Sequence, residues 1–209
     1  MKSAALGFRA HSGWAALVAV SLTKGAPCVL ARQRIHLVET FTYRFRQPFH
    51  TAKRMPLDHA RAFIVGVRTQ SRSLAHRAIR ELQESLRAQG YRLTRCGLVL
   101  ASGRPLPELT DILASHALIH TADGELFREA LLHASARSGL LSKTAKEREL
   151  LNEASRVLHL TPSALTRCVS DLGRPLGAPW SQDEKLAALI AWLALASKPL
   201  TVHRSRRAV

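Results

Sequence analysis

The sequence predicts an α/β domain in which a mixed β-sheet is flanked by helices. The first 50 residues contain short apolar and partly alternating runs, which are typical of antiparallel strands. Strand-like runs and helical periodicity then alternate along the rest of the chain. Apolar residues make up 46% of the 209 residues, which is enough for a core, although aromatic residues make up only 5%. We expect one domain over residues 1–198 and a disordered basic tail over 199–209.

Strands are expected first. Apolar runs over residues 4–8 and 14–22 predict two strands, and the sequence Thr-Lys-Gly at 23–25 predicts the turn that follows. Residues 28–38 alternate in part, as a half-exposed strand does. Aromatic and polar residues alternate over 41–45, which predicts a further strand. These runs would form the antiparallel part of the sheet.

A long helix is expected next, with Pro56 at its first position and Gly90 just after its end. Its apolar stripe is predicted to comprise Ala60, Ile64, Val67, Ser71, Leu74, Ala78, Leu82 and Leu86. Residues 92–101 are predicted to form the next strand, in which Cys96, Leu98, Val99 and Leu100 stand in near-continuous apolar order, as in a strand buried on both faces.

Short helices dominate the remainder. One helix is predicted to end near residue 119, another spans 121–138, and a short strand follows at 139–142. Residues 146–158 have helical periodicity. Thr161 is predicted to cap a helix that has Pro162 at its first position. Ser181 and Glu184 fit the S-x-x-E capping box in front of an apolar helix.

Basic side chains are concentrated in the first half of the chain. The whole sequence has 31 Lys and Arg against 15 Asp and Glu, a net charge of +16. Residues 1–106 hold 18 basic and 4 acidic side chains, a net charge of +14. Such an asymmetry predicts a polyanionic partner such as nucleic acid. The alternative is a compositional bias, because Arg outnumbers Lys by 24 to 7.

The chain contains three cysteines, Cys28, Cys96 and Cys168. They are widely spaced and lie in apolar runs, which argues against a disulfide framework or a zinc ribbon and fits a reducing compartment. We expect a cytoplasmic protein without membrane association, since no apolar run reaches the ~20 residues needed to span a bilayer. Lys2 and the apolar run at 14–22 resemble a signal peptide, but Arg9 and His11 directly precede that run and argue against it.

The first hairpin and the last predicted helix resemble those of the ribonuclease H-like fold. LGFRAHSGWAALV at residues 6–18 is similar to the opening hairpin, in which a strand ends in an acidic residue and returns after Ser or Gly. QDEKLAAL at 182–189 is similar to the closing helix, which presents an acidic residue in the nucleases. Junction-resolving nucleases and, more distantly, actin-like ATPase lobes share this fold. The chain as a whole also resembles a family of bacterial proteins of about this length, and the fold resemblance covers most of residues 4–196.

The resemblance implies catalytic carboxylates, and two of the expected acids are missing. The first would fall near Arg9 and the second near residues 101–103, which are Ala-Ser-Gly. Two-metal phosphodiester hydrolysis needs carboxylates that hold ions about 3.5–4 Å apart, and Asp183 alone cannot do this. We therefore predict no cofactor, with Mg²⁺ or Mn²⁺ required only if the chain is a nuclease.

Two loops and one turn are candidate anion sites. Residues 103–106 and 173–176 both read GRPL and precede predicted helices, whose free N–H groups favour anions beside an arginine. The turn after the first strand lies where the resemblance places the active cleft. The candidate ligand- or anion-binding residues are Arg9, His11, Ser12, Arg104, Arg174 and Asp183. The alternative is that these are ordinary loop and turn residues.

A candidate nucleic-acid face follows the predicted strands. It comprises Arg44, Arg46, Lys53 and Arg54, together with arginines of the long helix. Phe41, Tyr43, Phe45 and Phe49 are interleaved with them and are candidates for stacking on bases. The alternative is a solvated helix face beside a half-buried strand.

His116 and His120 have the i, i+4 spacing of a zinc-binding pair, for which Glu125 or Glu129 would be the third ligand. Because no HExxH motif accompanies them, we favour two helix-end histidines and predict no metal site. Asp123 and Glu125 are expected to complement a helix N-terminus.

Three functions follow from these observations. The first is a non-catalytic binding or interaction domain for a polyanion such as nucleic acid. The second is a metal-dependent nuclease or other nucleic-acid-processing enzyme that uses Asp183, Glu184 and Glu125. The third is a scaffold or oligomerisation protein. The absence of P-loop, GxGxxG and GxSxG motifs argues against NTPase, dinucleotide-dependent and α/β-hydrolase activities.

Overall fold

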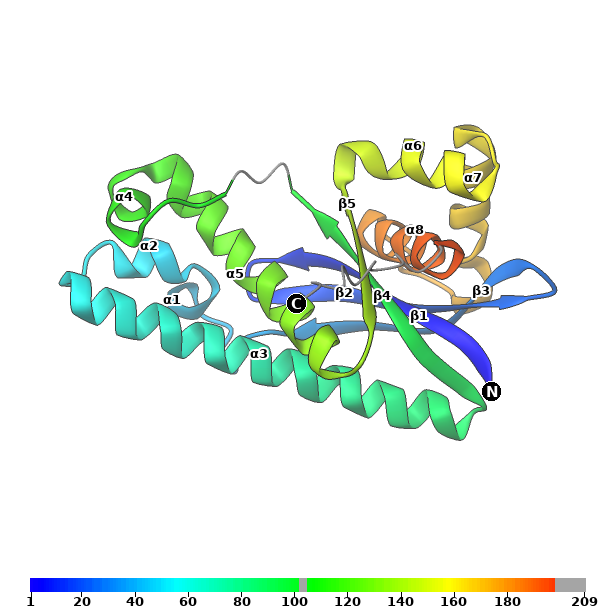
Figure 1. The fold of residues 1–209 in the computed structure, drawn as a ribbon, viewed down its shortest axis with the longest axis horizontal. Coiled ribbons are helices and arrows are strands. Elements are labelled where there is room, and N and C mark those ends of the chain that lie inside the picture. The colour runs from blue at the N-terminus through cyan, green and yellow to red at the C-terminus, as the bar shows by residue number, and fades with distance from the viewer. Residues whose placement is uncertain (102–104, 198–209) are drawn as a thin grey trace, which may run out of the picture.

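A five-stranded mixed sheet forms the centre of the computed structural model, which describes residues 1–101 and 105–197 (Figure 1). The strands are β1 (Lys2–His11), β2 (Trp14–Thr23), β3 (Ala26–His36), β4 (Tyr91–Leu100) and β5 (Leu141–Lys146). Their order is β3-β2-β1-β4-β5, in which β1, β2 and β3 are antiparallel, and β4 and β5 run parallel to β1. The predicted mixed sheet is confirmed. Arg104 and the predicted tail over 199–209 lie outside the described residues.

Helices cover both faces of the sheet (Figure 1). One face carries α1 (Tyr43–Arg46), α2 (Pro48–Ala52), α3 (Leu57–Ala88), α4 (Leu109–Ala114) and α5 (His116–Arg137). The other carries α6 (Glu147–Leu158), α7 (Pro162–Asp171), the 3₁₀ turn Arg174–Leu176 and α8 (Gln182–Ala196). Among the helices of the described residues, none combines the length and the apolar character that crossing a bilayer requires.

Alternation along the strands divides the core into two layers. On β1, Leu6 and Phe8 belong to the layer beneath α3 and α5, whereas Ala5 belongs to the layer beneath α8. Successive side chains of a strand point to opposite faces, so a strand covered on both sides is apolar at nearly every position. This explains the near-continuous apolar runs in β1, β2 and β4.

Two glycines let α8 lie directly on the sheet. Gly7 of β1 and Gly97 of β4 are paired across the strands. A Cβ added to Gly7 would lie 1.8 Å from the Ala187 carbonyl oxygen, and one added to Gly97 would lie 2.5 Å from the Ile190 oxygen. The backbone of α8 therefore occupies the space that side chains at these two positions would fill.

The predicted strand over residues 41–45 is wrong. Residues Tyr43–Arg46 form the short helix α1, because the N–H groups of Phe45 and Arg46 bond locally to the Thr42 carbonyl. Two of the aromatic side chains in this segment, Phe41 and Tyr43, are exposed. The alternation at Phe41 and Tyr43 therefore does not reflect burial of one face against the core.

The helix predictions are confirmed in type, with shifts in detail. The buried stripe of α3 passes through Ala75 and Ile79 in place of the predicted Leu74 and Ala78, because successive steps of four residues follow Ser71. The break between α4 and α5 falls at Ser115, whose hydroxyl accepts the Leu118 N–H. The predicted break lay five residues later, near residue 120.

Thiol alkylation of the native protein is expected to modify Cys28 first and to spare Cys96. Cys96 is fully buried in β4, and burial raises the pKa of its thiol. Burial also raises the pKa of the Cys168 thiol, which is only half-buried and should react at an intermediate rate. Intact-mass spectrometry over time measures the three rates, with denatured protein as the control. Equal rates at Cys28 and Cys96 would contradict the burial of β4.

Candidate functional site

The carboxyl ends of three parallel strands meet at one edge of the sheet. β1 ends at His11, β4 at Leu100 and β5 at Lys146. In open α/β sheets, ligands bind outside the carboxyl ends of the strands. The first turn of α8 lies at the same edge, because Asp183 contacts His11. We call this region the sheet-end site, and it comprises Arg9, His11, Ser12, Lys146, Glu147 and Asp183.

Arg9 occupies the place at which the resemblance implies the first catalytic acid. Its guanidinium lies 2.7 Å from a carboxylate oxygen of Glu147 at the start of α6, and it also donates to the Ala10 carbonyl at 3.1 Å. Its Nε is buried and has no hydrogen-bond partner within residues 1–101 and 105–197. β1 therefore presents a cation where metal binding would need an anion.

His11 joins the end of β1 to α8. Its Nε2 lies 2.9 Å from Asp183 Oδ1, although the alignment is not that of a hydrogen bond. Its ring stacks on Trp14 with a centroid separation of 4.3 Å. The capping box fixes the backbone around Asp183, since Glu184 accepts the Ser181 N–H. The Asp183 carboxylate is thus held against His11.

A continuous arginine–aromatic stack extends from His11 across β2 and β3. The Arg34 guanidinium lies 3.9 Å from the centre of the Trp14 ring and 5.6 Å from that of Phe41. Arg46 lies 4.5 Å from the centre of the Phe41 ring. We define this arginine–aromatic stack as Trp14, Arg34, Phe41 and Arg46. It holds two guanidinium planes beside the sheet-end site.

Arg46 also fixes the turn between β1 and β2. Its Nε donates to the Ser12 carbonyl at 3.3 Å. Gly13 in that turn has φ +82°, and a Cβ there would lie 2.8 Å from Arg46 Cγ. Glycine is therefore needed at position 13 for two reasons: it adopts the positive φ, and it leaves room for the side chain of Arg46.

The structure brings some of the predicted residues together and separates others. Arg9, His11, Ser12, Arg46 and Asp183 meet at the sheet end. Arg44 lies over the Phe45 and Phe63 rings, and Lys53 and Arg54 are exposed directly after α2. Arg174 is 80% exposed and pairs with Asp171 of α7, apart from this cluster. The residues that the sequence analysis missed are Arg34, Lys146 and Glu147. The only signal for Arg34 was its position in an alternating strand.

Within residues 1–101 and 105–197, the acids do not form the carboxylate cluster that a two-metal nuclease needs. Glu125 pairs with Arg128 at 2.9 Å, and Glu184 is used in the capping box. Asp183 faces His11, and β4 ends at Leu100 and Ala101. The predicted alternative set of Asp183, Glu184 and Glu125 does not converge in the described residues. These donors do not fit a pair of Mg²⁺ or Mn²⁺ ions.

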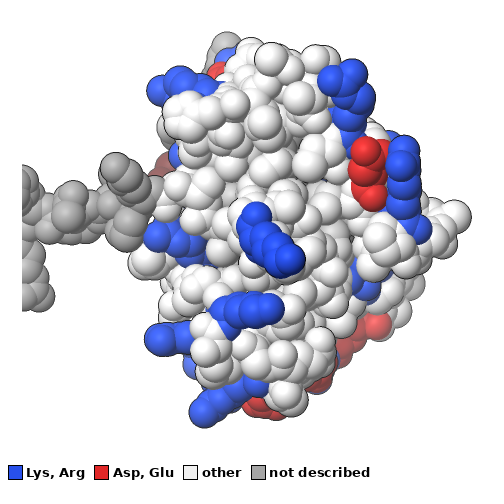
Figure 2. All heavy atoms as spheres, turned by 90° about the vertical axis from the view of Figure 1, so that its right-hand side faces the viewer, with Lys and Arg blue, Asp and Glu red and all other residues white. Residues whose placement is uncertain are grey.

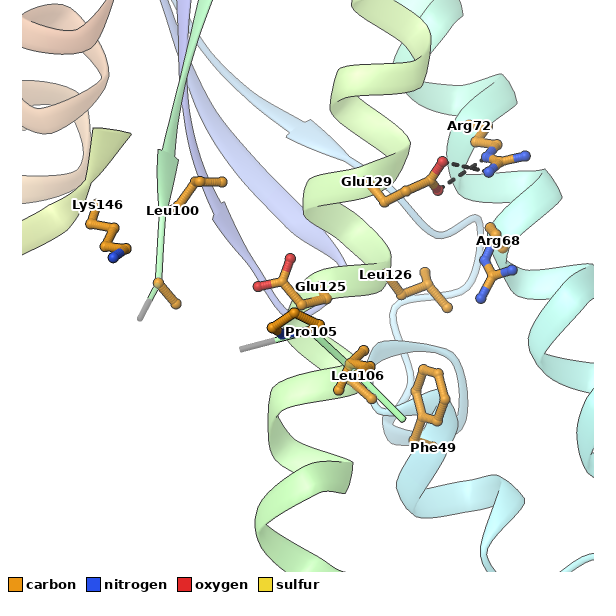
Figure 3. A pocket seen from close by; sticks show the side chains of 12 residues that line it. Phe49, Arg68, Arg72, Leu100, Pro105, Leu106, Glu125, Leu126, Glu129 and Lys146 are labelled. Atoms are coloured by element: carbon orange, nitrogen blue, oxygen red, sulfur yellow. Dashed lines mark hydrogen bonds and ion pairs between the residues drawn. The ribbon is translucent and has the colours of Figure 1, made fainter. Parts of the chain in front are cut away.

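A surface cavity of about 490 Å³ adjoins the sheet-end site (Figure 3). Lys146 lies at one side, Arg68 and Arg72 of α3 lie at the other, and apolar side chains including Leu126 form the wall between them. Arg72 is neutralised by Glu129, with Nε 3.0 Å from Oε2. Arg68 makes no ion pair within the described part of the chain. The cavity therefore adds cationic groups beside the sheet end.

Three histidines gather between α2 and α5. His116 and His120 are adjacent as predicted, but the third neighbour is His50 of α2. Glu125 and Glu129 were the predicted third ligands, and they pair with arginines instead. Asp123 complements the N-terminus of α2, a different helix from its own, by accepting the Phe49 N–H. Burial raises the pKa of the Asp123 carboxyl, and its hydrogen bonds oppose this rise.

Comparison with solved structures shows which known folds this chain resembles. A structure of Thermus thermophilus RuvC in complex with a Holliday junction substrate matches with a TM-score of 0.50 and 10% sequence identity, covering 90% of both chains. A second structure of Thermus thermophilus RuvC has a TM-score of 0.49 and 12% identity, again over 90% of both chains. The first likeness confirms the ribonuclease H-like fold. No protein-family model and no curated protein sequence matches the chain.

Proposed function

We propose that this protein is a non-catalytic nucleic-acid-binding domain whose contact surface is the sheet-end site with the arginine–aromatic stack. The observation that carries the proposal is the exchange of charge at the end of β1, where Arg9 stands at the position of an expected carboxylate. The likeness to a RuvC structure that contains a Holliday junction substrate supports nucleic acid over other polyanions. The net charge of +16 supports the same class of partner.

Arg34 and Arg46 are suited to phosphate because their planes are already fixed. Arg34 lies against the Trp14 and Phe41 rings, and Arg46 lies against the Phe41 ring. These contacts restrict each guanidinium, so less side-chain entropy is lost when its edge donates to a phosphate. The Trp14 ring already has two partners, since His11 stacks on it at 4.3 Å and the Arg34 guanidinium lies 3.9 Å from its centre. Trp14 therefore positions Arg34 and leaves base stacking to other rings.

Two aromatic rings are available for bases. Phe41 is 39% exposed and Tyr43 is 60% exposed, whereas Phe49 is buried. Of the aromatic residues expected to stack on bases, these two are accessible. Each stacked base contributes about 1–3 kcal/mol to binding of single strands. Arg44 of α1 and the exposed Lys53 and Arg54 directly after α2 supply further cations.

The basic excess is not confined to this region. Figure 2 shows the end of the molecule that carries the N-terminus, on the right of Figure 1, where Lys and Arg side chains are scattered over a largely uncharged surface with a few acidic side chains among them. Scattered charges contribute to long-range attraction of a polyanion. The ordered arrangement of cations and rings lies at the sheet end.

Fluorescence anisotropy with a labelled four-way junction, duplex and single-stranded DNA across a salt series tests this proposal. We expect binding to weaken steeply with salt, because each duplex phosphate contacted contributes a log–log slope of about −0.9. The double variant R34Q/R46Q should bind about tenfold more weakly and lower the magnitude of the duplex slope by about 2. The matched control is R156Q/R167Q, which removes two exposed arginines from α6 and α7.

The same samples distinguish a non-catalytic binding domain from a nuclease. Absence of binding at low salt, or equal binding by the two double variants, would overturn the proposed interface. Gel analysis with Mg²⁺, with Mn²⁺ and with chelator tests catalysis. Metal-dependent cleavage that is lost in Asp183→Asn would replace the non-catalytic proposal with the nuclease alternative.

A further inference from the structure

The three histidines between α2 and α5 have the geometry of a metal-binding set. The candidate ligand nitrogens of His50, His116 and His120 all lie within 4.8 Å of one another. Nε2 of His116 is 3.1 Å from Nε2 of His120. Two nitrogens bound tetrahedrally to one zinc ion at 2.0–2.1 Å would lie about 3.3 Å apart. The His116–His120 pair is therefore already at the spacing of two ligands of one ion.

Asp123 supplies an independent indication. Its side chain is 3% exposed, and its Oδ2 lies 2.5 Å from Nδ1 of His50. Its other oxygen accepts the Phe49 N–H at 2.7 Å. A carboxylate on Nδ1 holds the proton there and leaves the lone pair of Nε2 free, which is the usual support of a metal-binding histidine. Nε2 of His50 is therefore free to coordinate a metal ion.

The three histidine rings contact one another, and His116 is hydrogen-bonded to His120. His116 and His120 are exposed, and Asp123 is the one acid in the described residues that forms an ion pair with any of the three histidines. The rings of His50 and His120 lie 4.4 Å apart, and those of His116 and His120 lie 4.5 Å apart. A shared ion explains why three rings from two helices converge at an exposed position.

We propose that His50, His116 and His120 bind one divalent late transition-metal ion such as Zn²⁺. Imidazole nitrogens select this class over Mg²⁺ and Ca²⁺, which prefer oxygen ligands. Three protein ligands leave a fourth position for water or another ligand. The ion joins α2 to α5, and α2 directly follows the segment that bears Arg44 and Arg46. This site differs in place and in ligand chemistry from the acids of the ribonuclease H-like fold.

Metal titration of the full chain, free of any affinity tag and stripped with chelator, tests the site. Competition with a chromophoric chelator should give one high-affinity Zn²⁺ per chain, and Co²⁺ should give the visible bands of a tetrahedral complex. His120→Gln should abolish the Co²⁺ bands and weaken Zn²⁺ binding by about 100-fold or more. Asp123→Asn should weaken it by about 10–100-fold, as supporting carboxylates do. His59→Gln, which changes an exposed histidine of α3, is the matched control.

Thermal melts distinguish loss of the site from loss of the fold. Zn²⁺ should raise the melting temperature of the unsubstituted chain and of His59→Gln, but not that of His120→Gln. The proposal is overturned if the chain does not bind Zn²⁺, or if His120→Gln binds it as tightly as the unsubstituted protein. Because this test needs no nucleic acid, its outcome is separate from that of the proposed function.

Discussion

Replacing Gly7 with alanine is expected to destabilise the protein by about 3 kcal/mol or more, which is at or above the upper end of typical overpacking effects. The new methyl group would meet the Ala187 carbonyl oxygen at 1.8 Å, and a backbone atom cannot rotate away as a side chain can. The Ala191 Cβ lies 3.0 Å from the same position, so a small tilt of α8 does not relieve the contact. The helix must move off β1 as a whole.

Chemical denaturation of Gly7→Ala measures this effect, and Gly66→Ala provides a control of opposite sign. Gly66 lies in the exposed part of α3, with nothing within 4 Å of its added Cβ. The same substitution there should stabilise the protein by about 0.5–1 kcal/mol, because glycine is a poor helix former. A Gly7→Ala protein as stable as the parent would contradict the close packing of α8.

Replacing Asp123 with alanine is expected to destabilise the metal-free protein by about 2–3 kcal/mol. The buried carboxylate accepts hydrogen bonds from the Phe49 backbone and the His50 ring, and both donors belong to α2. Alanine leaves these groups without their acceptor in an enclosed place, and it frees the five-residue α2 from α5. Short helices depend on such tertiary contacts because they are marginal in isolation.

Thermal unfolding in the presence of chelator measures this loss without a contribution from bound metal. A change of this size should lower the melting temperature by about 2–4 °C per kcal/mol. Asp171→Ala is the control, because it removes an exposed carboxylate whose partner is the exposed Arg174. Such surface pairs contribute about 0–1 kcal/mol. Equal melting temperatures for the two variants would show that Asp123 does not hold α2.

Helix caps and apolar runs predicted most of the fold because they depend on interactions between residues that are close in the sequence. Thr161 caps α7 by accepting the Ala164 N–H, and the Ser181 capping box starts α8, as expected from sequence. The apolar runs of β1, β2 and β4 reported burial on two faces. The strand predicted at 41–45 failed because alternation also arises where rings such as Phe41 stack on arginines at the surface. Alternation indicates a strand only when one face is covered.

The candidate sites were less predictable because they depend on residues distant in sequence. The spacing of His116 and His120 indicated a pair, but His50 joins them only through the packing of α2 on α5. Glu147 and Asp183 reach Arg9 and His11 from the other layer of the molecule. No spacing rule links such residues, so the fold resemblance placed Arg9 among the candidates and charge placed Arg44 and Arg46 there.

The packing of α8 on the sheet has a consequence for how the protein is made. Synthesis proceeds from the N-terminus, and every strand is translated before residues 182–196. Until then, apolar side chains such as Val18 and Val99 lack the cover that α8 gives them, and the pair of His11 with Asp183 cannot form. Contacts this distant in sequence also close slowly. A nascent chain that lacks α8 should therefore expose apolar surface of the sheet, and the proposed binding of nucleic acid should begin only after α8 has docked.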